Sequence, residues 1–415
     1  MRQIITFLGT VIKPTTYRLG ETDYTGRVFA EALLQFVEFD QMLVCATDRA
    51  RETTWPVLES LNDPRIVCLD IETGHDSTEL WHIFDALTNT VNEGDTIIFD
   101  ITHGLRSLPF LVFLAAAYVK AAKNVTIEAI YYGALELGQP APIIDLSEFV
   151  ALLDWLAAAD RFTQIGDGRP LAGLLRDRMP PGLAMRDDLD ARALGHDLKL
   201  AASAIEQVSR ALSITRPLET MEAAARLGLA LRQTRKTVTA RARPFALLAE
   251  RVHDSYTPFA LSEPLDRANW PANLRLQLAM IRWYIDKEQI VQATTLAREW
   301  LVSLVAYRVG AVSLVDLDNE RFPIEGALNN ENRRRAGKEV NRPSPRDADV
   351  AALPALGDLI AVWGKMTDLR NDIAHVGMNE QPQSASTLYR KMTAIYPELN
   401  DLAQILLLDS DQEET

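Results

Sequence analysis

The hydrophobic positions of the first 145 residues alternate between two patterns. Short apolar runs, which are typical of buried strands, cover residues 3–8, 42–46, 65–70, 96–99 and 125–132. Apolar residues at helical spacing lie between these runs, at about 26–36, 48–61, 80–91 and 108–120. Repeated strand–helix–strand units predict an α/β domain with a parallel sheet and helices on both of its faces.

The strand order of such a sheet predicts where a ligand would bind. If the five strands lie in the order 3-2-1-4-5, the order reverses between the first strand and the fourth. Ligands of these sheets bind at the carboxyl ends of the strands that flank this point. In this chain those ends carry Gly9-Thr10 and the polar segment 100–107.

The polar segment is suited to binding an anion. Gly9 lets a backbone approach a ligand closely, and N–H groups at the helix start near Ser107 could hold a phosphate. Arg106 offers bidentate contact, whereas Thr10, Thr102 and His103 offer neutral hydrogen bonds. The alternative is that Asp100, Thr102 and Ser107 only cap the helix and stabilise a turn. Neither G-x-G-x-x-G nor G-x-x-x-x-G-K-[ST] occurs here, so a dinucleotide cofactor or a P-loop is not supported.

The second half of the chain follows a helical pattern. Segment 166–190 contains Gly-Asp-Gly and Met-Pro-Pro-Gly, which predict a linker between a domain at 1–165 and one at 191–415. Helical periods then predict an all-α bundle with helices at 191–214, 217–240, 272–287, 290–309, 355–376 and 384–408. The polar segment 316–349 is expected to be irregular. Its triplet Arg333-Arg334-Arg335 is either a solvated loop or an RNA-binding patch.

Composition narrows the classes of partner. The net charge is −14, which argues against non-specific coating by nucleic acid and leaves room for RNA only at a local site. The longest uncharged apolar run, 108–119, is too short to span a bilayer, and no signal-peptide pattern occurs, so we expect a cytoplasmic protein without membrane contact. The two cysteines, Cys45 and Cys68, fall in predicted strands and suggest no disulfide. No second His or Cys lies at ligand spacing from His103, so no metal site is expected.

A second group of polar residues falls near the end of a predicted helix. Apolar residues at spacings of three and four place Arg370, Asn371 and His375 on an amphipathic helix that Gly377 is expected to end. Asn371 and His375 are four residues apart, so they share a face, and Arg370 has the reach to join them. Such a set suits phosphodiester chemistry on RNA, in which the imidazole moves a proton and the guanidinium holds the phosphate. The alternative is a histidine that favours the helix dipole beside an ordinary surface pair of Arg370 and Asp372.

Both polar groups resemble one family. The stretches Phe7-Leu8-Gly9-Thr10, Phe99 to Ser107 (F-D-I-T-H-G-L-R-S), Tyr131-Tyr132-Gly133 and Arg370 to His375 (R-N-D-I-A-H) are similar to the CARF-HEPN effectors of type III CRISPR systems. The resemblance implies a Rossmann-like CARF domain followed by an all-helical HEPN domain. It also implies that Gly9, Thr10, Thr102, His103, Gly104, Arg106 and Ser107 bind a cyclic oligoadenylate. Arg370, Asn371 and His375 would form a ribonuclease site.

This resemblance implies a homodimeric endoribonuclease that cleaves single-stranded RNA without a metal or cofactor and that a cyclic oligoadenylate activates. Cyclic tetra-adenylate is the favoured activator, and assembly beyond the dimer stays open. Two alternatives remain at this point. The helical half could be inactive, which would leave a regulatory protein that binds the messenger. The sensor could instead cleave the messenger slowly, with Thr10, His103 or Arg106 assisting.

Overall fold

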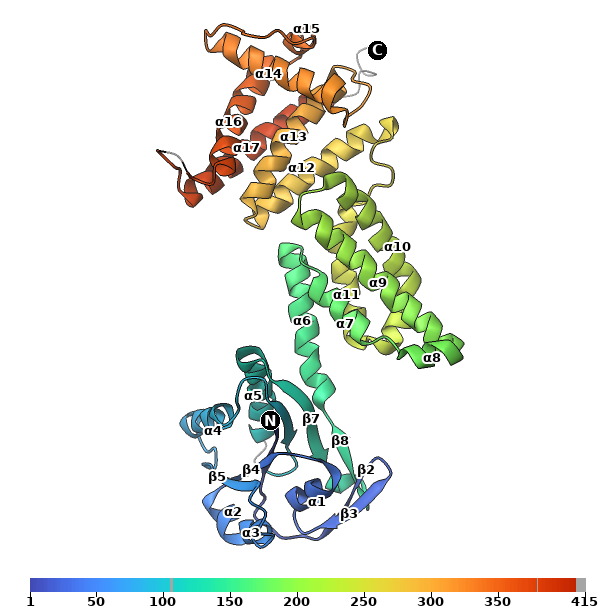
Figure 1. Cartoon of the computed structure of the whole chain (residues 1–415), viewed down its shortest axis with the longest axis vertical. Helices are drawn as coiled ribbons and strands as arrows, with labels where there is room; N and C mark the ends of the chain where they lie inside the picture. Colours follow the sequence, from blue (N-terminus) through green and yellow to red (C-terminus); the bar gives the residue numbers. More distant parts are fainter. Residues whose placement is uncertain (105–106, 379, 408–415) are drawn as a thin grey trace. The chain divides into compact units, whose positions relative to one another are not determined.

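The chain folds into two compact units, residues 1–154 and 155–415 (Figure 1). The computed structural model describes residues 1–104, 107–378 and 380–407. The first unit is a mixed α/β domain, and the described residues of the second form helices joined by turns and loops, without a strand. The boundary between the units falls within helix α6 (Ser147–Ile165) rather than after it.

The first unit is organised around a sheet whose order is β3-β2-β8-β7-β6-β1-β4-β5. Neighbouring strands of the segment β7-β6-β1-β4-β5 are paired in parallel, and they lie in the 3-2-1-4-5 order on which the expected ligand position depends. The strands are β1 (Arg2–Phe7), β2 (Thr15–Leu19), β3 (Thr22–Gly26), β4 (Gln41–Ala46), β5 (Ile66–Asp70), β6 (Thr96–Asp100), β7 (Thr126–Gly133) and β8 (Ala141–Asp145).

Two hydrophobic cores lie on opposite faces of this sheet, because side chains alternate along each strand. In β1, Ile4 packs with helices α1, α2 and α3, whereas Ile5 packs with α4 and α5. The helices of this unit are α1 (Phe29–Phe36), α2 (Asp48–Thr53), α3 (Trp55–Glu59), α4 (Ser77–Asn89) and α5 (Ser107–Lys123). Helices therefore cover both faces of the sheet. The carboxyl ends of the parallel strands are left as the place where a ligand could bind.

Three features of this unit differ from the sequence prediction. The Thr- and Tyr-rich segment 13–25, expected to be a loop, forms the antiparallel hairpin β2–β3, in which Thr15 and Tyr17 are buried. Strand β8 was not predicted and adds an antiparallel neighbour to β7, so the whole sheet is mixed rather than parallel. The single helix expected at 48–61 is two short helices, α2 and α3, with Pro56 near the start of the second.

The second unit is built around one continuous hydrophobic core. The predicted helices at 191–214, 217–240, 272–287, 290–309, 355–376 and 384–408 are all present within a few residues of their expected ends. The helices are α7 (Arg169–Asp177), α8 (Gly182–Asp187), α9 (Leu189–Ser213), α10 (Pro217–Arg241), α11 (Arg243–Tyr256), α12 (Trp270–Asp286), α13 (Ile290–Arg308), α14 (Phe322–Arg335), α15 (Asp347–Ala351), α16 (Leu356–Ala374) and α17 (Ala385–Leu406).

The segment 166–190, expected to be a linker, carries helices α7 and α8 instead. Leu171 and Leu175, one turn apart on α7, are buried in the core of the helical unit. The glycines and prolines that suggested a linker lie at the helix ends, where Gly168 and Pro170 mark the start of α7.

The polar segment 316–349 also contains a helix that the sequence pattern missed. Helix α14 buries Ile324 and Leu328 on one face and ends with the arginine triplet. In this triplet Arg334 forms ion pairs with Glu331 and Asp347, while Arg335 pairs with Glu331. Through these pairs the triplet joins the end of α14 to Asp347, the first residue of α15. They favour a structural role for the triplet over an RNA-binding role.

Every described helix is too short or too polar to cross a bilayer. No group of three or more His, Cys, Asp or Glu side chains gathers among the described residues in a way that could hold a metal ion.

Candidate functional site

The carboxyl ends of β1 and β6 meet at the expected edge of the sheet. The two strands are parallel neighbours, with Ile5 opposite Phe99, so Gly9-Thr10 and the segment after Asp100 leave the sheet side by side. Helix α5 begins at Ser107, seven residues after the end of β6. A loop follows each strand, and the two loops form the first candidate site.

Asp100, the last residue of β6, anchors this loop from inside the core. Its carboxylate is fully buried and accepts hydrogen bonds from Thr6 Oγ1 at 2.5 Å and from the Thr102 N–H at 2.7 Å. Burial raises the pKa of the Asp100 carboxyl, while the bonds from Thr102 and Thr6 act in the opposite direction. A buried carboxyl with two donors joins the start of the loop to β1.

Replacing Asp100 by alanine should therefore lower the free energy of unfolding by about 2–4 kcal/mol, because two buried donors lose their acceptor. Chemical denaturation of the full chain measures the effect. Asp76, the exposed N-cap of α4 that accepts from the Thr78 and Glu79 N–H groups, is the matched control. Asp76→Ala should cost about 1 kcal/mol. Equal costs for the two variants would contradict the anchoring role of Asp100.

Two pockets open at the loop and share Gly9 and Thr10. The first, of about 340 Å³, lies between the ends of β1, β4 and β5 and also includes Gly104 in its lining. The second, of about 240 Å³, is bounded by the loop on one side, where His103 lines it, and by the hairpin side of the sheet on the other. The Gly9-Thr10 backbone is thus the wall between two neighbouring cavities.

Basic side chains line both pockets. Arg49 and His75 border the first pocket, and Lys13 and Arg27 border the second. Arg27 is held by Glu31 at 2.7 Å, whereas Arg49 and Lys13 form no ion pair within the described part of the chain. Uncommitted cations beside polar loops suit an anionic ligand with several phosphates.

Sequence reasoning missed Arg49, His75 and Lys13. Arg49 follows β4 and His75 follows β5, so both extend the site along the same edge of the sheet by two further strands. The available signal was their position just after the predicted strands 42–46 and 65–70. Lys13 precedes the hairpin that the sequence pattern did not predict.

Glycines set the shape of the loop. A Cβ at Gly9 would lie only 3.2 Å from Cγ and Nδ1 of His103, so the imidazole packs directly on the Gly9 backbone. Gly104 has a φ of +127°, which only glycine adopts readily, and a Cβ there would lie 2.5 Å from Leu108 Cδ1. Each glycine therefore makes room for a neighbour that lines or supports the site.

The remaining predicted ligand residues lie differently. Thr102 Oγ1 accepts a hydrogen bond from the Gly133 N–H at 2.8 Å, so this hydroxyl joins the loop to the end of β7. Ser107 is the first residue of α5 and is not part of the lining of either pocket. Arg106, predicted to clamp a phosphate, lies outside the described residues.

The second predicted site lies at the carboxyl end of α16, in the helical unit. Arg370 and Asn371 are on the last turns of the helix, and His375 is its C-cap residue. The chain then turns through Gly377, whose φ is +71° and whose N–H approaches the Asp372 carbonyl at 3.4 Å. This glycine is the helix terminator that the sequence predicted.

The polar side chains of this second set face solvent. Arg370, Asn371 and His375 are all exposed, whereas Leu369 beside them is 1% exposed and belongs to the core. Arg370 Nη1 donates to Asn371 Oδ1 at 3.3 Å, and no ion pair involves Arg370 or His375 among the described residues. A cation, an amide and an imidazole are thus presented together on one exposed helix end, where they are accessible to a large anionic substrate.

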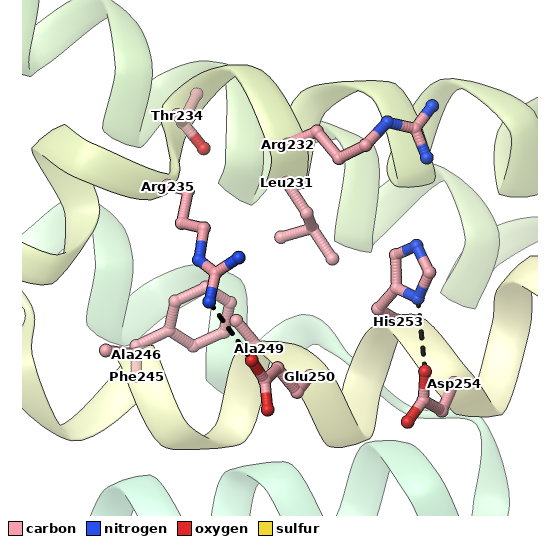
Figure 2. A pocket seen from close by; sticks show the side chains of 10 residues that line it. All are labelled: Leu231, Arg232, Thr234, Arg235, Phe245, Ala246, Ala249, Glu250, His253 and Asp254. Carbon is pink, nitrogen blue, oxygen red and sulfur yellow. Dashed lines mark hydrogen bonds and ion pairs between the residues drawn. The ribbon is translucent and has the colours of Figure 1, made fainter.

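A further pocket lies between α10 and α11 and has a volume of about 320 Å³ (Figure 2). Leu231 and Phe245 contribute to its apolar floor. Two of its side chains already have acidic neighbours, because Arg235 lies against Glu250 and His253 against Asp254, as Figure 2 shows. Glu250 and Asp254 place carboxylates in its lining, whereas the pockets around Gly9 have none, so this pocket is less suited to an anionic ligand.

Comparison with known proteins finds a relative for part of this chain. No family model matches the chain. It is 38% identical over 117 residues to CRISPR-associated protein MJ1674 from Methanocaldococcus jannaschii. The match covers 26% of this chain and only 18% of the archaeal protein. The relative is therefore much longer than the segment they share.

Proposed function

We propose that this protein is a ribonuclease of CRISPR defence, of the CARF-HEPN type, that a cyclic oligoadenylate activates. On this proposal the α/β unit is a Rossmann-like CARF sensor, and the helical unit carries a HEPN active site that cleaves single-stranded RNA without a metal. The similarity to a CRISPR-associated protein supports the biological setting. The observation that carries the enzymatic part is the exposed set of Arg370, Asn371 and His375 at one helix end.

The cleavage chemistry follows from these groups. His375 takes the proton from a ribose 2′-hydroxyl, and the 2′-oxygen attacks the adjacent phosphorus. The bond between phosphorus and the 5′-oxygen then breaks. The leaving 5′-oxygen receives a proton from His375 of the second chain of the proposed dimer. Arg370 stabilises the charge that develops on the phosphate. The products are a 2′,3′-cyclic phosphate and a free 5′-hydroxyl.

The pockets around Gly9 suit the proposed messenger. A cyclic oligoadenylate carries several phosphates and several bases, so it needs cations and apolar recesses close together. Arg49 and Lys13 supply uncommitted cations, and Phe7 and Leu8 contribute apolar lining to the larger pocket. Binding would activate the enzyme only if the messenger prefers one arrangement of the dimer over another.

An exposed apolar stripe supports the homodimer. Phe110, Leu114 and Tyr118 are spaced by one helical turn along α5, and they are 68%, 43% and 54% exposed. Tyr118 contacts Phe84 of α4, which in turn contacts Trp81, so the apolar surface continues onto the next helix. Contiguous exposed apolar surface marks an interaction site. The stripe begins three residues after the start of α5, next to the sensor loop.

Leu114→Glu should convert the dimer to a monomer, because a carboxylate at the centre of the interface would be desolvated without a partner. Light scattering across a concentration series should show a dissociation constant raised by about a hundredfold or more. Leu247 on α11 is 85% exposed and outside this stripe, so Leu247→Glu is the matched control and should leave the mass unchanged. An unchanged dimer in the Leu114 variant would contradict the proposed interface.

The proposed function is tested by RNA cleavage in the presence of cyclic tri-, tetra- and hexa-adenylate, with a chelator in the buffer. Messenger binding without RNA cleavage under all these conditions would instead favour the regulatory protein with an inactive helical half.

A further inference from the structure

Basic residues are concentrated towards the end of helix α10. Segment 232–243 contains five basic residues and no acidic residue, although acidic residues outnumber basic ones by 57 to 43 in the whole chain. The five are Arg232, Arg235, Lys236, Arg241 and Arg243. The composition of the chain therefore does not explain why acidic residues are missing from this segment.

Three of these cations, Arg232, Arg235 and Lys236, form what we call the basic surface of α10. All three are exposed, and the second and third follow Arg232 by three and four residues, so both are its neighbours on the helix. Arg232 and Lys236 form no ion pair within the described part of the chain. Arg235 lies 3.2 Å from Glu250, and their side chains are 75% and 74% exposed. Because such an exposed pair contributes little free energy, a phosphate can compete with Glu250 for Arg235.

Helix stability does not account for the basic surface. Cations favour the carboxyl end of a helix through its dipole, but this effect is confined to about the last turn. Helix α10 ends at Arg241, so Arg232, Arg235 and Lys236 all precede its last turn. Like charges four residues apart also repel each other. The basic surface therefore destabilises the helix slightly unless an anionic partner neutralises it.

The pocket between α10 and α11, of about 320 Å³, adjoins the basic surface. Arg232 and Arg235 are part of its lining, and Leu231 gives it apolar surface. Figure 2 shows that both arginines come from α10, whereas Glu250 and Asp254 come from α11 across the pocket. These carboxylates oppose a phosphate inside the pocket but can accept hydrogen bonds from the N–H groups of a base. Phosphates are thus expected on the basic surface and a neutral base in the pocket.

We infer that the basic surface of α10 binds the phosphate backbone of single-stranded RNA, with an unstacked base directed to the adjoining pocket. A single strand presents a row of phosphates together with bases that are free to leave the stack. An anionic bilayer would also attract these cations, but its flat surface could not enter the pocket between two helices. Contacts to phosphates carry no sequence information, so this binding is independent of RNA sequence.

This inference rests on the proposed function in that RNA is the substrate there. Arg232 and Lys236 lie on α10, and Arg370 and His375 lie at the end of α16, so the basic surface holds the strand and takes no part in the cleavage step. A local group of cations also gives an anionic strand a place to bind on a chain with a net charge of −14.

Neutralising two of the cations tests the inference. The double variant Arg232→Gln and Lys236→Gln is made in the His375→Ala protein, so that the RNA is not consumed. We expect it to bind an oligouridylate of about twenty nucleotides more weakly than the His375→Ala protein does. The plot of log binding constant against log salt should become shallower by about 1.4, since each phosphate contact to a single strand contributes about 0.7. Fluorescence anisotropy over a salt series, without messenger, measures both effects.

The matched control is the double variant Arg275→Gln and Lys338→Gln in the same background. These residues are also an exposed arginine and an exposed lysine without an ion pair among the described residues, and they lie outside the basic surface. The control removes the same net charge and should keep the original slope. Equal slopes for the two double variants would overturn the inference. Loss of binding to phosphatidylserine vesicles in the Arg232 and Lys236 variant, with RNA binding unchanged, would overturn it in favour of a membrane.

The two proposals fail in different ways. If the chain with His375 cleaved no RNA but the slope changed as expected, the proposed function would be wrong and the basic surface would stand. If the chain cleaved RNA but the Arg232 and Lys236 variant kept the original slope, only this inference would be wrong. Where both hold, the same two substitutions in the chain with His375 should raise KM for the oligouridylate and leave kcat unchanged.

Discussion

Replacing His375 by alanine should reduce messenger-dependent RNA cleavage by about 10²–10⁴-fold, the contribution typical of a general acid–base group. The substitution should leave the fold intact, because His375 is exposed at the end of α16 and contributes to its cap through the backbone rather than the side chain. Cleavage of an end-labelled single-stranded RNA, followed over time at saturating messenger, measures the loss.

The control for this variant is His196→Ala, which removes an exposed histidine from α9, a helix without candidate catalytic residues. It should cleave RNA like the unsubstituted protein. Messenger affinity should be unchanged in both variants, since the sensor pockets lie in the other unit. If the His375 variant cleaved RNA at the full rate, Arg370, Asn371 and His375 would not be the ribonuclease site and would only form the end of α16.

The Gly9→Val substitution should weaken messenger binding and leave the cleavage rate at saturating messenger nearly unchanged, which is the reverse of the effect expected for His375→Ala. The new side chain would meet the His103 ring, because even a Cβ would lie 3.2 Å from it, and it would occupy the wall shared by the two sensor pockets. We expect messenger affinity to fall by about tenfold or more. Cleavage should then require proportionally more messenger and should approach the normal rate when messenger is saturating.

A valine at Gly173 is the matched control, because a Cβ at this position in α7 meets no neighbouring atom within 4 Å. In the Gly173→Val protein, the messenger should activate RNA cleavage at the same concentrations as in the unsubstituted protein. If Gly9→Val bound the messenger as tightly as the unsubstituted protein, the pockets around Gly9 would not be the sensor. A rate that stayed low at saturating messenger would mean that Gly9 acts on catalysis as well.

The parallel strands could be located because each of them is a short run of apolar residues, and β1, β4 and β6 are buried on both faces. Ile4 and Ile5 belong to different cores, and both are fully buried. The hairpin β2–β3 was missed because its residues are polar. Its buried positions, Thr15 and Tyr17, alternate with outward-facing ones, and this period of two was outweighed by the high Thr content of the segment.

Helices α14 and α7 were missed for different physical reasons. Helix α14 is polar on most of its surface, and its apolar face is narrow, with Ile324, Ala327 and Leu328. Ion pairs at its end and tertiary packing, rather than hydrophobic periodicity, hold it in place. Helix α7 was hidden by flanking glycines and prolines, although Leu171 and Leu175 have helical spacing.

Residues of the candidate sites could be predicted where they belong to one continuous sequence motif. Gly9, Thr10, His103 and Gly104 line the expected pockets, and Arg370, Asn371 and His375 lie on the expected helix end. Residues that follow other strands, such as Arg49 on α2 after β4, were not found, because their approach to Gly9 depends on the tertiary fold. The role of Thr102 in holding the Gly133 N–H was likewise invisible in the sequence.

The most direct test of the proposed function is the cleavage of single-stranded RNA by the full chain with no messenger and with cyclic tri-, tetra- or hexa-adenylate, in parallel and with chelator present. We expect cleavage with one ring size, with cyclic tetra-adenylate favoured, and almost none without messenger. Cleavage that is equal with and without messenger, or no cleavage with any ring, would contradict the proposal that the α/β unit controls a ribonuclease site at Arg370 and His375.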